Sequence, residues 1–245
     1  MGKRAKAILF TAVGVILVGG LAAFIAPKIY RDYFAAPAAV TPTLSANEST
    51  LKADPGEPLD PAAFVGDWQV GAGSYAGYRV NEVLNGTDVT VTGRTEQVTG
   101  SLTAEGQTVT QATFTVDVAS IKTDNSSRDG YFRENVVRAS ANPTATFTLT
   151  TPLTIDRVPN SGEVTEHTLS GDLTLAGVTK PVSVTVQLRV DAPAAGTNTG
   201  TVEIAGQIPI TFADFGMTAP NLGFVSVEPT GSVEFSLALD RPAAQ

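Results

Sequence analysis

The feature that most limits how this chain can fold is an alternation of apolar and polar residues with a period of two. It is clearest in four runs, 113–118, 144–149, 182–190 and 233–239. Successive side chains of a strand point to opposite faces, so each run has one apolar and one polar face. The pattern therefore predicts an antiparallel sheet with a buried inner face and a solvated outer face.

Short turns separate these runs and indicate about eight or nine strands. The turn signals are Asn85-Gly86, Glu105-Gly106, Ser161-Gly162, Ala176-Gly177 and Asn198-Thr199-Gly200. One stretch, Arg128–Ala141, has the composition of a short helix that begins after possible cap residues at 125–127 and ends before Pro143. Many short strands with few helices predict an all-β sandwich or barrel, and an eight-stranded barrel is either filled or holds one small ligand.

The N-terminal segment has a different character. Residues Ala7–Ala26 contain no charge, and about twenty apolar residues are enough to cross the hydrocarbon core of a bilayer. Lys3, Arg4 and Lys6 precede this run, so we expect residues 1–6 to be cytoplasmic, 7–26 to be a single transmembrane anchor and the rest to be extracytoplasmic at the cell membrane. A cleaved signal peptide is the alternative, although its apolar core is usually shorter.

Between the anchor and the β pattern, residues 27–61 are rich in proline, alanine, serine and threonine. Proline lacks a backbone donor and fixes φ, so we expect a semi-extended linker here. The folded domain is then predicted to occupy residues 62–245.

The composition excludes several classes of function. Without cysteine there is no disulfide framework or thiolate metal site, and a net charge of −8 argues against nucleic-acid binding. His167 is the only histidine, and no G-x-S-x-G elbow surrounds a serine, so neither a metal site nor a catalytic triad is expected. We predict no enzyme activity and no cofactor.

The segment around Asp124 carries charges that could suggest chemistry. Its sequence DNSSRDG lacks the acids that a calcium loop needs at its third and fifth positions, so it is interpreted as a turn and helix cap. Asp124, Asp129 and Glu134 alternate with arginines, including Arg128, which is typical of a solvated salt-bridge surface.

Several short motifs, in order, resemble the YceI family. They are Ser74, Tyr78 and Val80 in an opening strand, SIKT at 120–123 followed by RDGYFR at 128–133, NPTATF at 142–147, GDLTLAGVTKPV at 171–182 and DFGM at 214–217. Together the matches run from Trp68 to about Leu239. The resemblance implies an extended lipocalin-like antiparallel β-barrel with a long isoprenoid or other lipid chain in its interior.

If a lipid lies in the barrel, the residues that alternate toward the inner face of the strands are candidates for lining it. These are Tyr78, Val80, Glu82, Phe114, Val116, Phe132, Phe147, Phe212, Phe215, Met217 and Phe235. Phe132 and Met217 are expected near the mouth. For each aromatic or aliphatic member, packing in a filled core is the alternative interpretation.

Two positions depart from the family pattern. Glu82 stands where many relatives have histidine, and Thr211-Phe212-Ala213 stands where relatives often have arginine. A carboxylate facing the interior needs a partner, and Arg94 is the candidate that we consider.

The sequence therefore predicts a membrane-tethered, extracytoplasmic binding protein for an apolar lipid: a polyisoprenoid, an isoprenoid quinone or a fatty acyl chain. The alternative is a cell-envelope interaction module with a filled barrel and a protein partner. From residue 62 onward 10 Lys and Arg face 19 Asp and Glu, a net of −9, so the outer face would repel anionic head groups. The sequence leaves the oligomeric state open.

Overall fold

The structure is a computed structural model that describes residues 37–44, 59–60, 62, 64–84, 86–191 and 200–241. The predicted cytoplasmic residues 1–6, the anchor at 7–26 and most of the linker at 27–61 lie outside the described residues. Among the residues that are described, no helix has the length and apolar character needed to cross a membrane.

The described chain consists mainly of β-strands. The strands are β1 (Gly66–Val70), β2 (Tyr75–Leu84), β3 (Thr87–Thr95), β4 (Val98–Glu105), β5 (Thr108–Asp117), β6 (Thr144–Leu149), β7 (Leu153–Thr154), β8 (Val164–Leu175), β9 (Val178–Asp191), β10 (Thr201–Thr211) and β11 (Val225–Asp240). The helical pieces are η3 (Val118–Ser120), α2 (Ser126–Tyr131), η4 (Phe132–Val136) and η5 (Phe212–Phe215).

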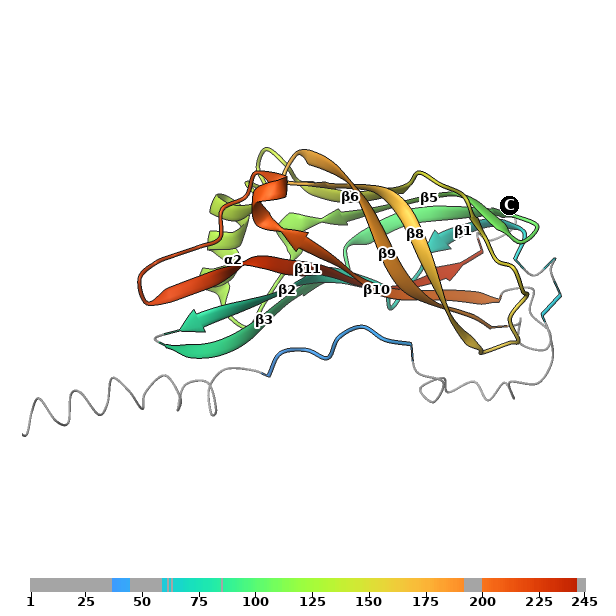
Figure 1. The fold of residues 1–245 in the computed structure, drawn as a ribbon, viewed down its shortest axis with the longest axis horizontal. Coiled ribbons are helices and arrows are strands. Elements are labelled where there is room, and N and C mark those ends of the chain that lie inside the picture. Colours follow the sequence, from blue (N-terminus) through green and yellow to red (C-terminus); the bar gives the residue numbers. More distant parts are fainter. Residues whose placement is uncertain are drawn as a thin grey trace, which may run out of the picture.

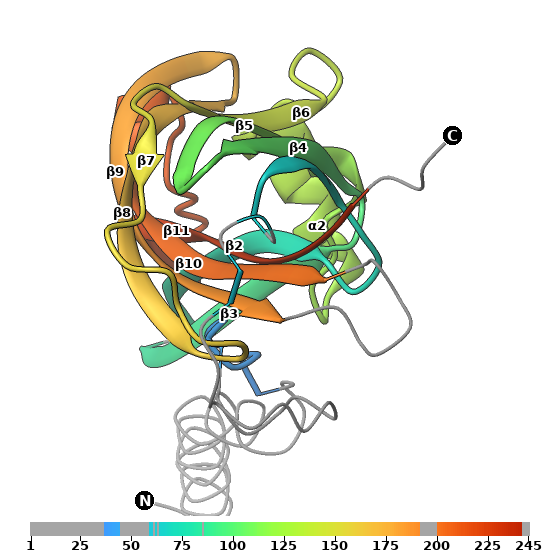
Figure 2. The same ribbon diagram turned by 90° about the vertical axis from the view of Figure 1, so that its right-hand side faces the viewer.

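Eight strands close into an antiparallel ring, in the order β1-β4-β5-β6-β8-β9-β10-β11 and back to β1. The hairpin β2–β3 extends this wall, because β2 pairs with β11 beyond the stretch that pairs with β1. Figure 2 shows the ring seen from one end, and Figure 1 shows α2 at the opposite end of the long axis. The predicted all-β barrel with one short helix is therefore confirmed.

The bend between β1 and β2 explains the glycine-rich stretch 71–74. The Ser74 hydroxyl donates to the carbonyl of Ala238 (3.1 Å) and accepts from its amide (2.9 Å). At the bend, this side chain therefore makes the two hydrogen bonds that the backbone of a neighbouring strand would otherwise make. Gly71 also donates to the Ala238 carbonyl. A Cβ on Gly71 would overlap the Asp240 carboxylate, so a larger residue there would require the exposed Asp240 side chain to move.

The helical segment is shorter than the sequence indicates. Asn125 caps α2 by accepting from the amides of Ser127 and Arg128, but the helix continues as one wide π-turn and ends at Val136 rather than near Pro143. Arg138 has φ of 52°, a left-handed conformation that a helix cannot contain. The helix therefore ends because the backbone reverses hand, and the later proline is not needed to stop it.

The end of the barrel opposite α2 is filled by side chains. Trp68 is 1% exposed and Leu239 is fully buried, and Val190 and Val202 are buried with them in one hydrophobic core cluster. The Trp68 indole donates to the carbonyl of Phe64 (3.1 Å), which satisfies its one polar group. This end of the barrel is therefore a packed core.

A described part of the linker, residues 37–44, lies on the outer face of the barrel. Glu234 of β11 is 1% exposed and pairs with Arg79 (2.5 Å) and Arg94 (3.5 Å). Both arginines also donate to this segment, Arg79 to the carbonyl of Ala39 and Arg94 to that of Val40. This stretch of linker is therefore bound to the barrel, and its buried ion pairs lie outside the barrel interior.

Candidate functional site

Two adjoining cavities lie inside the barrel. The mouth cavity, at the α2 end, has about 900 Å³ of free space and the deep cavity about 610 Å³, and both values include space that is open to solvent. Four residues line both cavities and so mark the waist between them: Ala76, Val116, Ala145 and Val233.

Strand β2 shows the direction of this interior space. Ala76 belongs to both cavities, whereas Tyr78, Val80 and Glu82 line only the mouth cavity. At about 3.3 Å per residue, Ala76 and Glu82 are roughly 20 Å apart along the strand. We call the two adjoining cavities together the tunnel; it has Glu82 at its mouth and apolar side chains at its deep end.

Ten of the eleven predicted lining residues border these cavities. The mouth cavity is lined by Tyr78, Val80, Glu82, Val116, Phe132, Phe212 and Met217, and the deep cavity by Phe114, Val116, Phe147 and Phe235. Phe215 is the exception. It is buried at the end of η5 but borders an outer groove between β9 and β10.

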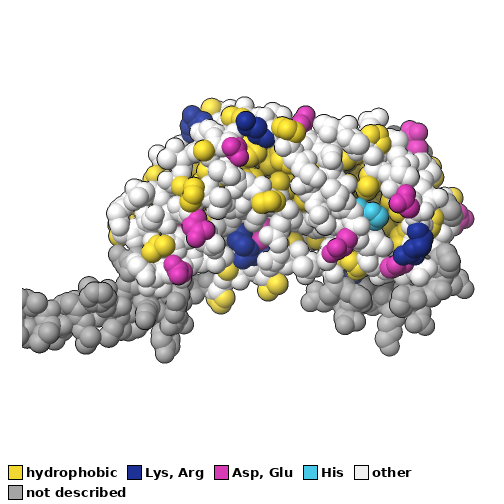
Figure 3. All heavy atoms as spheres, in the orientation of Figure 1, with side chains coloured by type: hydrophobic (Ala, Val, Ile, Leu, Met, Phe, Trp, Pro, Cys, Tyr) yellow, Lys and Arg dark blue, Asp and Glu magenta, His cyan; other side chains and the backbone are white. Residues whose placement is uncertain are grey.

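This outer groove arises because β9 and β10 diverge. Their described pairing extends only from Asp191↔Thr201 to Val186↔Gly206, although β9 continues to pair with β8 and β10 with β11. η5 packs against both strands at the divergence. Figure 3 shows apolar side chains in a recess of this face, with charged side chains of both signs around it.

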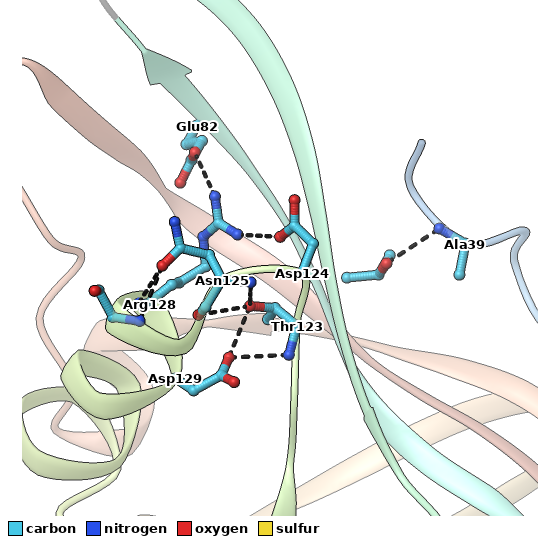
Figure 4. Close-up of polar contacts among 9 residues, drawn as sticks. Ala39, Glu82, Thr123, Asp124, Asn125, Arg128 and Asp129 are labelled. Carbon is cyan, nitrogen blue, oxygen red and sulfur yellow. Dashed lines mark hydrogen bonds and ion pairs between the residues drawn. The ribbon is translucent and has the colours of Figure 1, made fainter. Parts of the chain in front are cut away.

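The mouth cavity contains one ion pair. Glu82 is 5% exposed, and Arg128 of α2 donates from Nη2 to its Oε1 at 3.3 Å. Arg128 also donates from Nη1 to Asp124 at 2.5 Å, so its guanidinium lies between two carboxylates (Figure 4). Arg94, the partner that we considered for Glu82, instead pairs with Glu234, because it lies on the outer face of β3.

The Arg128 position is set by a hydrogen-bonded loop. Asp129 is buried and accepts from both the amide (2.9 Å) and the hydroxyl (2.7 Å) of Thr123, while Asn125 caps the helix (Figure 4). The carboxylates of Glu82 and Asp124 raise the pKa of Arg128 despite its partial burial. Arg128 is therefore a fixed cation at the mouth.

Tyr78 contributes a phenol to the mouth cavity. Its ring stacks on Phe132 with centroids 4.7 Å apart. Burial raises the pKa of Tyr78 far above its ordinary value. The positive charge of Arg128 lowers this pKa, and the negative charges of Asp129, Glu82 and Asp124 raise it. Among the described residues its hydroxyl has no hydrogen-bond partner, so the neutral phenol can bond to a ligand.

The loop and helical residues between β5 and β6 supply lining residues that sequence reasoning missed. These include Ile121, Arg128, Tyr131, Val136 and Val137. Strand parity gives no information about residues outside strands. The one usable signal was Glu82, since an acid on an apolar strand face requires a cation from a neighbouring element.

The rim of the mouth is apolar on one side. Pro220 and Val227 line the mouth cavity, and the hairpin between them is closed by the amide of Val227 donating to the carbonyl of Pro220 (2.9 Å). At its tip Leu222 is 48% and Phe224 58% exposed. Large apolar side chains therefore face solvent next to the opening.

Other candidate chemistry stays separate from the cavities. His167 lies on β8, where Thr165 contacts its Nε2 (2.9 Å), and burial lowers its pKa. Within the described ranges, no group of three or more His, Asp or Glu side chains is arranged to hold a metal ion.

The comparison with known families agrees with this architecture. The model of the YceI-like domain matches residues 68–239, well over half of the chain. The chain belongs to the YceI family. Its motif residues surround the tunnel: Ile121, Arg128 and Phe132 line the mouth cavity, and the 214–217 motif ends η5 and includes Met217.

Known proteins of similar sequence or fold extend this comparison. A UPF0312 protein of Pseudomonas aeruginosa is 31% identical over 130 residues, covering 51% of this chain but only 62% of that protein. A polyisoprenoid binding domain from Saccharophagus degradans is 19% identical with a TM-score of 0.56, covering 73% of this chain and 99% of that chain. Burkholderia cenocepacia BcnA is 19% identical with a TM-score of 0.47, covering 66% and 95%. The Saccharophagus domain shares the fold.

Proposed function

We propose that the protein binds one long apolar lipid, a polyisoprenoid, an isoprenoid quinone or a fatty acyl chain, inside its barrel. The observation that carries the proposal is the tunnel formed by two apolar cavities that share a waist. Each buried CH₂ contributes about 0.8 kcal/mol, so a long chain needs few polar contacts. The Saccharophagus protein, which shares the fold, is named a polyisoprenoid binding domain, and this supports the same ligand class.

The alternative of a filled barrel with a protein partner finds less support. In the described part of the chain, side chains fill the end around Trp68, whereas the interior nearer α2 contains free space lined by Phe114, Phe132 and Phe147. Ligand binding accounts for this free space, because folding alone favours close packing.

We further propose that the chain is tethered to the cell membrane through residues 7–26, with the barrel outside the cytoplasm. The apolar run and the preceding basic residues support this topology. The exposed Leu222 and Phe224 beside the mouth fit a barrel that exchanges its ligand with a membrane. Alkaline extraction of membranes should leave the full chain in the pellet, and external protease should digest the barrel in spheroplasts.

Native mass spectrometry of the detergent-purified full chain, followed by solvent extraction and lipid identification, tests the ligand proposal. A stoichiometric prenyl or acyl species is expected. An apo mass that takes up neither added polyprenyl lipids nor quinones would contradict lipid binding and leave the filled-barrel alternative.

A further inference from the structure

The charges at the tunnel mouth bear on the head group of the ligand. Arg128 is the only basic residue among those lining the mouth cavity in the described chain, and Glu82 is the only acidic one. Arginine is a common ligand of phosphate and carboxylate groups because it offers paired donors. Here both terminal nitrogens of Arg128 are already bonded, one to Glu82 and one to Asp124.

The local charge is therefore negative. The phenol of Tyr78 interacts electrostatically with one positive side chain, Arg128. It also interacts with three negative side chains, those of Glu82, Asp124 and Asp129. A phosphate monoester carries about −1.5 to −2 charges near pH 7. A phosphate bonded to the remaining N–H groups of Arg128 would lie close to the carboxylates of Glu82 and Asp124, which like-charge repulsion opposes.

The same groups suit a neutral head group. Glu82 makes one hydrogen bond, at 3.3 Å and through Oε1, so among the described residues its Oε2 is a free acceptor. The Tyr78 hydroxyl, deeper along β2, has no described partner and can donate. Glu82 and Arg128 also border a cleft on the outer surface, so the pair lies between tunnel and solvent.

We propose that the tunnel mouth selects an uncharged head group that donates a hydrogen bond, such as an alcohol or a primary amide, and disfavours a phosphate ester. This inference rests on the proposed lipid binding. The tail occupies the apolar cavities and the head group donates to Glu82. Selectivity against the phosphate comes from the carboxylates of Glu82 and Asp124, which are both bonded to Arg128 and repel a second anion.

A competition experiment tests the inference. Equal concentrations of geranylgeraniol and geranylgeranyl phosphate are added to the delipidated full chain in a nonionic detergent, and native mass spectrometry measures both complexes in one spectrum. The alcohol complex should exceed the phosphate complex by roughly tenfold or more. In Glu82→Gln, which keeps the side-chain size and removes one negative charge, the ratio should shift several-fold toward the phosphate.

Glu105→Gln is the matched control, because Glu105 is exposed at the end of β4 and lines neither cavity. Its ratio should equal that of the unmodified chain. Equal binding of the two ligands, a preference for the phosphate, or the same shift in both variants would overturn head-group selection while leaving lipid binding intact. Binding of neither ligand would overturn lipid binding itself, and the inference with it.

Discussion

Tyr78 is the residue whose ionisation reports most directly on the tunnel. Burial raises the pKa of Tyr78, so its phenol should stay protonated in the folded state after ordinary tyrosines have ionised. In a pH titration followed by the ultraviolet absorbance of tyrosinate, the Tyr78 contribution should therefore appear only when the protein unfolds. Tyr78→Phe should remove that contribution, whereas Tyr75→Phe should retain it.

The sign of the accompanying stability change follows from proton linkage. Above about pH 10 the unfolded chain has lost the Tyr78 proton and the folded chain has kept it, so the free energy of unfolding falls as pH rises. The decrease should be smaller in Tyr78→Phe. An equal decrease in both proteins would contradict a buried phenol.

Arg128 and Glu82 should differ in how costly they are to replace. Arg128→Met leaves the Glu82 carboxylate buried without its cation and should lower the free energy of unfolding by roughly 1–3 kcal/mol. Glu82→Gln should cost less, because glutamine can still accept from the guanidinium. Urea unfolding of the two single variants and of the double variant measures these changes in the free energy of unfolding.

The double variant should recover much of the Arg128→Met loss, since it removes the buried charge together with its partner. If the two single losses simply add, the two side chains are not coupled, and the ion pair at the mouth contributes nothing to stability.

The same two residues show where sequence reasoning is strong and where it fails. The interior position of Glu82 follows from strand parity with Tyr78 and Val80, and the need for a cation follows from burial. The identity of that cation could not be predicted, because Arg128 reaches the tunnel from a loop-capped helix. Its interpretation as a surface residue came from helical spacing, which does not show what the helix packs against.

At the scale of strands, the waist between the cavities should limit the length of the ligand. Ala76 lines both cavities and its side chain is small, so the ring of Ala76→Phe would fill the passage. Binding of a geranylgeraniol chain should weaken roughly tenfold or more, because each excluded CH₂ forfeits about 0.8 kcal/mol. Geraniol, which is half as long and short enough for the mouth cavity, should bind as before.

Val83→Phe is the control for this change, since Val83 lies on the same strand but faces solvent. It should leave the affinity for both alcohols unchanged. If Ala76→Phe binds the long alcohol normally, the ligand does not pass the waist.

The rim hairpin should affect exchange rather than affinity. Leu222→Ser with Phe224→Ser removes exposed apolar surface beside the mouth but no residue that lines the tunnel. Transfer of a fluorescent prenol from vesicles to the full chain should slow several-fold, with the equilibrium affinity unchanged. Val65→Ser, which changes an exposed valine elsewhere, should leave the transfer rate unaltered.

Some element boundaries follow from the local sequence, and others depend on contacts between residues that are far apart in the chain. The strand runs at 113–118, 144–149, 182–190 and 233–239 correspond to β5, β6, β9 and β11, because alternation is a local property of the chain. The Ala176-Gly177 turn is also local, with φ of 51° and 81° at its two residues. The bend at Ser74 depends on Ala238, which is 164 residues away, and no local pattern predicts it.

For the whole molecule, the barrel is asymmetric along its axis. One end is packed around Trp68 and Leu239, and the other contains the mouth, α2 and the rim hairpin. A ligand tail therefore has one open end through which to enter, and its head group must remain near Glu82. The β alternation predicts a sandwich or a barrel, and it does not tell which half of the interior is filled, since Phe114 and Trp68 are equally apolar.

The most direct test of this account is an electron-density map of the protein crystallised with geranylgeraniol. If the tunnel binds the alcohol, continuous density should extend through both cavities, past Ala76 and Val233, with the hydroxyl beside Glu82. Side chains that meet across the barrel and leave the alcohol outside it would contradict the account.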